Sequence, residues 1–169
     1  MLKHCRKLLT GAVTAGAIAT ITAAGITAAS AHTRPAATGT EHFQIMETSA
    51  TSRTHSIIGT GVFTEGGTTT DSSRTTSTVT FPNGTFVITH SKGTGSQSFN
   101  PKTCLLQINL KGTYSLGSGT GAYTHLSGSG TYQLNILAVG AKSGGTCSKT
   151  LPPVAFQQVI RASGPASLS

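Results

Sequence analysis

The amino-acid sequence predicts an all-β domain, a single antiparallel β-barrel of about eight strands. After residue 40 the chain is a series of short runs rich in Thr, Val and Ile, separated by Gly, Pro, Asn and Ser, without a helical apolar period. The phrase Gly-Thr-Tyr-x-Leu occurs at residues 112–116 and again at 130–134, and each copy alternates apolar with polar side chains. Eight antiparallel strands can close into a barrel, and closure removes exposed strand edges. A two-sheet β-sandwich is the alternative fold.

The N-terminal segment, residues 1–31, has the features of a signal peptide of bacterial type. Three basic residues precede an uncharged apolar run over residues 8–28, which ends at the cleavage motif Ala29-Ser30-Ala31. We therefore expect a secreted, extracellular protein that begins at His32 and has no membrane contact after cleavage. An uncleaved membrane anchor is the alternative.

The remaining chain is expected to consist of a flexible leader over residues 32–40, the barrel domain over residues 41–163 and a tail over residues 164–169. Pro82-Asn83-Gly84 predicts a tight hairpin between two apolar runs, because Asn-Gly tolerates the backbone angles of such a turn. Asp71 follows Gly66-Gly67 in a Thr- and Ser-rich stretch and is expected in a loop. The expected strands of this first part span residues 42–47, 57–64, 75–81 and 85–90.

The second part of the domain contains the two copies of Gly-Thr-Tyr-x-Leu. We expect them to be two strands joined by a compact turn that contains Gly119-Thr120-Gly121 and about one helical turn. A Gly- and Ser-rich loop over residues 141–148 precedes the last strand. The expected strands of this part span residues 103–109, 112–116, 130–134 and 154–162.

The charge and the histidines exclude several classes of function. The chain has 12 Lys and Arg against 4 Asp and Glu, and removal of residues 1–31 would leave a net charge of +5. The basic residues are scattered singly, so we expect no nucleic-acid binding. The histidines lack the spacing of metal ligands, so no metal and no cofactor are expected.

Cys104 and Cys147 are the two cysteines that would remain after cleavage. An even pair in an exported domain predicts a disulfide. A metal-binding or catalytic thiol is the alternative, but neither cysteine has a His or Cys nearby at ligand spacing.

The glycine-rich turn resembles a motif of a known barrel family. Residues 119–123, Gly-Thr-Gly-Ala-Tyr, look like the Gly-Gly-Thr-Gly-x-(Phe/Tyr) signature of the allene oxide cyclase and dirigent barrels, with Ser118 in place of the first glycine. Residues 119–132 match the variant Gly-Thr-Gly-x-Tyr-x-x-Leu-x-Gly-x-Gly-x-Tyr of secreted bacterial members of unknown function. The resemblance implies a barrel and, because dirigent relatives are often oligomers, leaves a homo-oligomer open.

Glu47 is the candidate catalytic residue, because it shares a strand face with Phe43 and Ile45, and burial in a barrel would raise its pKa and suit it to proton transfer. Ile45-Met46-Glu47 also resembles the first-strand Val-Tyr-Glu of allene oxide cyclases, whose glutamate lies in the barrel cavity, although Ser49 stands where that family has Asn. The alternative is a solvent-exposed Glu47 at a strand end. The residues expected to line a ligand cavity are Phe43, Ile45, Phe86, His90 and Tyr123.

Three functions remain open. The first is non-catalytic binding of a small apolar or phenolic ligand inside the barrel, and a non-enzymatic role is slightly favoured. The second is an isomerase or cyclase that uses Glu47. The third is a cell-surface interaction protein whose barrel is filled by its own side chains.

Overall fold

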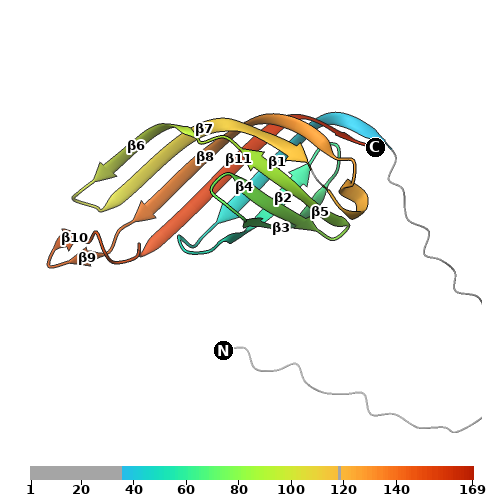
Figure 1. Cartoon of the computed structure of the whole chain (residues 1–169). Coiled ribbons are helices and arrows are strands. Elements are labelled where there is room, and N and C mark those ends of the chain that lie inside the picture. Colours follow the sequence, from blue (N-terminus) through green and yellow to red (C-terminus); the bar gives the residue numbers. More distant parts are fainter. Residues whose placement is uncertain (1–35, 118) are drawn as a thin grey trace, which may run out of the picture. The chain divides into compact units, whose positions relative to one another are not determined.

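The computed structural model describes residues 36–117 and 119–169, so the expected signal peptide, the first residues of the expected leader and Ser118 lie outside the described residues. The fold is all-β (Figure 1). Eight antiparallel strands follow one another in the order β5-β4-β3-β2-β1-β11-β8-β7, and a pairing of β5 with β7 closes the barrel. The prediction of a closed antiparallel barrel is confirmed, and the sandwich alternative is wrong. No helix of the described residues is long and apolar enough to cross a membrane.

The element bounds show which runs of the sequence form strands. The order along the chain is β1 (Ala37–Glu47), β2 (Thr54–Thr60), β3 (Glu65–Asp71), β4 (Thr76–Phe81), β5 (Gly84–His90), β6 (Thr94–Asn100), β7 (Leu105–Gly117), the 3-10 turn η1 (Gly121–Tyr123), β8 (Ser127–Val139), β9 (Lys142–Ser143), β10 (Thr146–Cys147) and β11 (Ala155–Leu168).

One end of the barrel is closed by the glycine-rich turn that follows β7. The backbone N–H of Thr120 donates to the carbonyl of Thr85 at 2.8 Å, and that of Ala122 donates to the carbonyl of Asn83 at 2.8 Å. The turn therefore lies against the β4–β5 hairpin, whose Pro82-Asn83 turn is as predicted. Gly121 has φ +58, and a Cβ at this position would collide with the Asn83 carbonyl. Glycine is required here both for its backbone conformation and for the close approach.

The turn inserts Tyr123 into an aromatic core at this closed end. Tyr123 has no exposed surface, and its ring centroid lies 5.2 Å from that of Phe63 and 5.3 Å from that of Phe86. Phe81 packs against the same rings. Tilted and edge-on contacts at these distances add to the apolar burial that stabilises the barrel.

Three strands continue past the other end of the barrel. β7, β8 and β11 have 13, 13 and 14 residues, and β6 pairs with residues 105–111 of β7 outside the closed ring. The extension consists of β6, the first half of β7, the second half of β8, the start of β11 and the β9–β10 hairpin (Figure 1). The barrel is thus closed at one end and continued by an open sheet at the other.

Several expected boundaries are wrong. The leader was expected to be flexible to residue 40, yet residues 37–40 belong to β1. The expected tail belongs to β11. The two segments pair with each other, Ala37 with Leu168 and Thr40 with Pro165. Asp71 lies at the end of β3 and not in a loop. Residues 103–109 and 112–116 form the single strand β7 instead of two strands, apart from the turn residues Thr103 and Cys104. Short polar strands such as β3 (EGGTTTD) and β6 (TGSQSFN) carry little apolar alternation, so the pattern did not reveal them.

Candidate ligand-binding site at the open end of the barrel

A cavity of about 270 Å³ lies within the barrel toward the open end. The strand register explains its place. Phe43 pairs with Ala162 and Ala162 with Tyr132, which forms one inward-facing row across β1, β11 and β8. The next row toward the extension runs from Ile45 to Ile160 and Leu134 in the same way, and all six of these side chains line the cavity.

The repeated Gly-Thr-Tyr-x-Leu phrase builds one wall of this cavity. The two copies pair antiparallel, so that Gly112 lies opposite Tyr132 and Tyr114 lies opposite Gly130. A Cβ on Gly112 would come within 2.5 Å of the Tyr132 ring, and one on Gly130 within 2.8 Å of the Tyr114 ring. The glycine of each copy therefore leaves the space that the tyrosine of the other copy fills. Both tyrosines line the cavity.

Two hydroxyl groups of the cavity wall are buried without a hydrogen-bond partner among the described residues, those of Tyr114 and Thr69. The side chains are 5% and 1% exposed. Burial, with a smaller contribution from the negative charge of Glu41, raises the pKa of Tyr114 to about 12, so this phenol is protonated at neutral pH. Buried polar groups in proteins nearly always have a partner. The two side chains line the cavity, but their hydroxyl oxygens are covered, so a ligand would pair with them after a small movement of the side chains.

A chain of polar side chains lies at the rim of the cavity. Nδ1 of His55 lies 3.6 Å from Oε2 of Glu47, and Nε2 lies 3.4 Å from Oδ2 of Asp71. Ser77 donates its hydroxyl proton to Oδ1 of Asp71 at 2.7 Å. The guanidinium of Arg53 donates to the backbone carbonyl of Asp71 at 2.9 Å and holds the end of β3 in place. His55 is thus a buried imidazole that lies between two carboxylates.

Glu47 is buried at the end of β1, and the alternative of a solvent-exposed Glu47 is wrong. Burial raises the pKa of Glu47; the neighbouring His55 acts in the opposite direction and the charge of Asp71 raises it further. Glu47 contacts His55, which lines the cavity, but Glu47 is not among the lining residues itself. Any influence of Glu47 on a ligand would therefore pass through His55.

The other wall of the open end contains His90 and Tyr132. Their rings meet edge-on with centroids 5.8 Å apart, and the hydroxyl of Tyr132 donates to the backbone carbonyl of Ser91 at 3.0 Å. Burial raises the pKa of Tyr132, against the effect of this hydrogen bond. Nδ1 of His90 lies 3.2 Å from the same Ser91 carbonyl, so both side chains contact a residue outside the cavity lining and this wall is preorganised.

Of the residues predicted to line a ligand cavity, Phe43, Ile45 and His90 do so. The prediction is wrong for Phe86 and Tyr123, which have no exposed surface and lie in the aromatic core at the closed end. They face inward as expected, but the barrel is filled at their depth.

Sequence reasoning missed several residues of the site, namely Thr69, Tyr114, Asp71, Ser77 and the contact that His55 makes with Glu47. A signal existed for His55, which alternates with Ile57 and Gly59 on the buried face of β2. None existed for Thr69 and Asp71, because β3 was not recognised as a strand.

The predicted disulfide between Cys104 and Cys147 is confirmed, with an S–S distance of 2.00 Å. It lies in the extension, away from the residues that line the cavity. Residues 36–117 and 119–169 contain no group of three or more His, Cys, Asp or Glu side chains arranged to hold a metal ion.

Comparisons with known proteins add no relative: no protein family, curated protein or solved structure matches this chain. The resemblance of residues 119–132 to allene oxide cyclase and dirigent barrels therefore stays a prediction.

Proposed function

We propose that this protein binds a small molecule with an apolar body and a hydrogen-bonding oxygen, such as a phenol, in the cavity at the open end of the barrel. The observation that carries the proposal is the pair of buried hydroxyls of Tyr114 and Thr69, which have no hydrogen-bond partner among the described residues and belong to side chains that line a cavity of mostly apolar surface. Leaving such groups unpaired costs about 1–3 kcal/mol each, and a ligand that pairs with them recovers part of that cost.

The size and the lining of the cavity limit the class of ligand. Pockets for drug-sized ligands usually have about 300–1,000 Å³, so a cavity of about 270 Å³ suits a compact molecule. Phe43, Ile45, Ile88, Leu134 and Ile160 surround its body with apolar surface. Each buried methylene contributes about 0.8 kcal/mol, which is about a fourfold gain in affinity.

Calorimetric titration with 4-propylphenol and propylbenzene tests this proposal. The phenol is expected to bind about two- to tenfold more tightly, because one additional hydrogen bond contributes about 0.5–1.5 kcal/mol. In Tyr114→Phe this preference should shrink while propylbenzene binding is retained, since the ring remains and the hydroxyl is removed.

A variant that fills the cavity supplies the matched control. Ala162→Phe places a ring among the lining residues and should abolish binding of both probes. Ala155→Phe makes the same change on the same strand at an exposed position and should leave binding intact. The proposal would be refuted if Ala162→Phe and Ala155→Phe bound each probe equally well, or if the unsubstituted chain bound neither probe.

A second candidate function is isomerisation or cyclisation by proton transfer. The observation that favours it is the imidazole of His55, which lines the cavity and lies between the carboxylates of Glu47 and Asp71. In this proposal His55 exchanges the proton with the substrate and Glu47 orients the imidazole ring. Glu47→Gln should then reduce turnover strongly while affinity for a non-reacting phenol stays unchanged. If Glu47→Gln leaves turnover of a converted substrate unchanged, Glu47 has no such role.

A further inference from the structure

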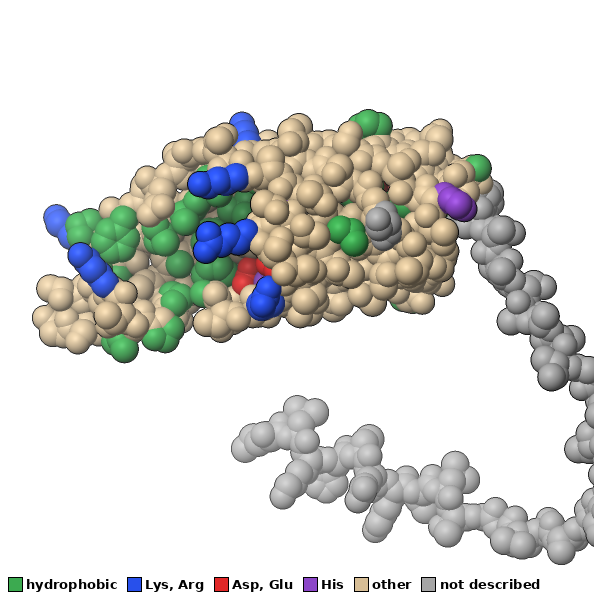
Figure 2. Space-filling model, in the orientation of Figure 1, with side chains coloured by type: hydrophobic (Ala, Val, Ile, Leu, Met, Phe, Trp, Pro, Cys, Tyr) green, Lys and Arg blue, Asp and Glu red, His purple; other side chains and the backbone are tan. Residues whose placement is uncertain are grey.

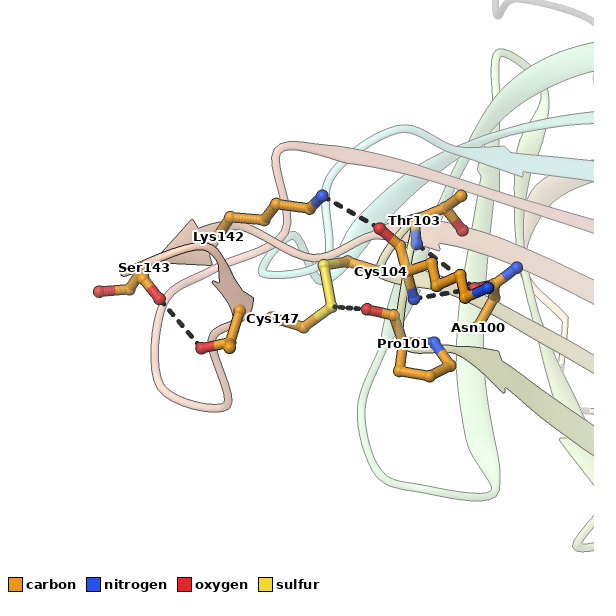
Figure 3. Close-up of a disulfide and its surroundings, with 9 residues drawn as sticks. Asn100, Pro101, Thr103, Cys104, Lys142, Ser143 and Cys147 are labelled. Carbon is orange, nitrogen blue, oxygen red and sulfur yellow. Dashed lines mark hydrogen bonds between the residues drawn. A yellow bond between two sulfur atoms is a disulfide. The ribbon is translucent and has the colours of Figure 1, made fainter.

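The far end of the extension is a distinct, cross-linked surface, which we call the tip and define as residues 99–104 and 137–154. The disulfide joins the turn after β6 to the β9–β10 hairpin (Figure 3). Lys142 donates from Nζ to the backbone carbonyl of Lys102 at 3.0 Å, and the N–H of Gly140 donates to the carbonyl of Cys104 at 2.9 Å. These bonds hold the two segments of the tip together.

The tip concentrates exposed apolar side chains. Phe99, Leu151 and Val154 are 53%, 51% and 70% exposed. With Leu137, whose side chain lies on the opposite face of the sheet from Phe99, they make up four of the six large apolar side chains that are exposed among the described residues. Single exposed apolar residues are common on protein surfaces, but their concentration at one end of the fold indicates an interaction site.

Positive and negative side chains are also distributed unevenly between the tip and the barrel. Lys102, Lys142 and Lys149 lie in it, and its sequence contains no Asp or Glu. The four acidic residues of the whole chain lie in β1 and β3 of the barrel. Figure 2 shows apolar side chains (green) along the extension with Lys and Arg side chains (blue) beside them. The tip is therefore an apolar surface with only positive charge.

We propose that the tip docks on an anionic phospholipid surface. Apolar side chains that enter the boundary between headgroups and acyl chains, together with lysines that meet anionic headgroups, are the two components of peripheral membrane binding. A nucleic acid would engage the lysines but leave Leu151 and Val154 in water, so the aliphatic side chains favour lipid. The inference is independent of the cavity, and it departs from the expectation that the chain lacks a membrane partner after cleavage.

A fluorescent label at the tip tests the docking directly. Val154→Cys in a Cys5→Ser chain is labelled with an environment-sensitive dye, and vesicles of phosphatidylglycerol and phosphatidylcholine in equal amounts are added. We expect a blue shift and a rise in intensity, because the dye enters an apolar environment. The same dye at His125→Cys, an exposed position beside the closed end of the barrel, should not respond. This local readout reports on the tip whatever residues 1–31 do.

Charge variants test the role of the lysines. Each lysine near an anionic surface contributes about 1 kcal/mol, which corresponds to about a fivefold change in affinity. Lys149→Glu and Lys102→Glu should therefore lower the apparent vesicle affinity at least about fivefold. Lys111→Glu, the same change on the outward face of β7, is the matched control and should have little effect.

Four results would overturn the proposal. They are the absence of a response at position 154, an equal response at position 125, an equal response to vesicles of phosphatidylcholine alone, and the same response to polyglutamate without lipid. The last result would identify the partner as an acidic polymer.

Discussion

Removing the disulfide should destabilise the whole domain, because the cross-link restricts the unfolded chain. Cys104 and Cys147 are 43 residues apart in sequence. In the chain-entropy relation, closure of a loop of this length lowers the entropy of the unfolded state by about 13 cal/mol/K, or about 4 kcal/mol at 25 °C. β7, β8 and β11 run without interruption from the barrel into the extension, so the tip and the barrel should unfold together.

The assay compares urea unfolding of the unsubstituted chain with that of the double variant Cys104→Ser/Cys147→Ser. We expect a loss of about 4 kcal/mol in the free energy of unfolding. With an unfolding entropy of about 2.1 cal/mol/K per residue over a domain of this size, the thermal midpoint should fall by about 14 °C. Phenol binding should persist at temperatures where the variant is folded, since neither cysteine lines the cavity. A loss below about 1 kcal/mol would show that the tip unfolds independently of the barrel, and would refute this reasoning.

Three further substitutions test the barrel. Gly121→Ala should cost about 2–3 kcal/mol in urea unfolding, because alanine resists the positive φ and its Cβ collides with the Asn83 carbonyl; a neutral result would contradict the structure of the turn. Tyr114 binds its proton more tightly in the folded state, so the free energy of unfolding should fall as pH rises from its ordinary pKa of 10 toward about 12. Tyr114→Phe should remove this fall. If the phenolate absorbance of the unsubstituted chain is already complete near pH 10, Tyr114 is not buried as described. Burial likewise raises the pKa of Glu47, so the contribution of its protonated form to stability is present at acidic pH and is lost as pH rises above 4.5. In urea unfolding, the free energy of unfolding of Glu47→Gln relative to that of the unsubstituted chain should therefore be higher at pH 7 than at pH 4. The opposite order would show that the pair with His55 dominates.

Features that depend on local chemistry could be predicted from the sequence. Alternating Thr- and Val-rich runs determine the all-β class, and Pro82-Asn83 determines a tight hairpin because its residues suit the turn. Cys104 and Cys147 predict their own cross-link, because Cys5 lies in the expected signal peptide and the two remaining cysteines permit only one connection. The two copies of Gly-Thr-Tyr-x-Leu form neighbouring strands as expected, because a compact turn joins them.

The site depends on strand register, which is set by the tertiary structure and cannot be read from the sequence pattern. Tyr114 and Thr69 come from β7 and β3, which are not neighbours in the sheet, and both line the cavity because the barrel closes between β5 and β7. His55 lies between Glu47 and Asp71 because β1 and β3 end at the level of the barrel where the antiparallel strand β2 begins. Phe86 faces inward as the alternation of β5 predicts and Tyr123 is inserted by the turn η1, but their depth along the barrel places both in the filled end. Alternation in a strand specifies which face is buried, whereas the stagger of eight strands specifies the depth of each side chain, and that stagger arises from pairings between segments far apart in the sequence.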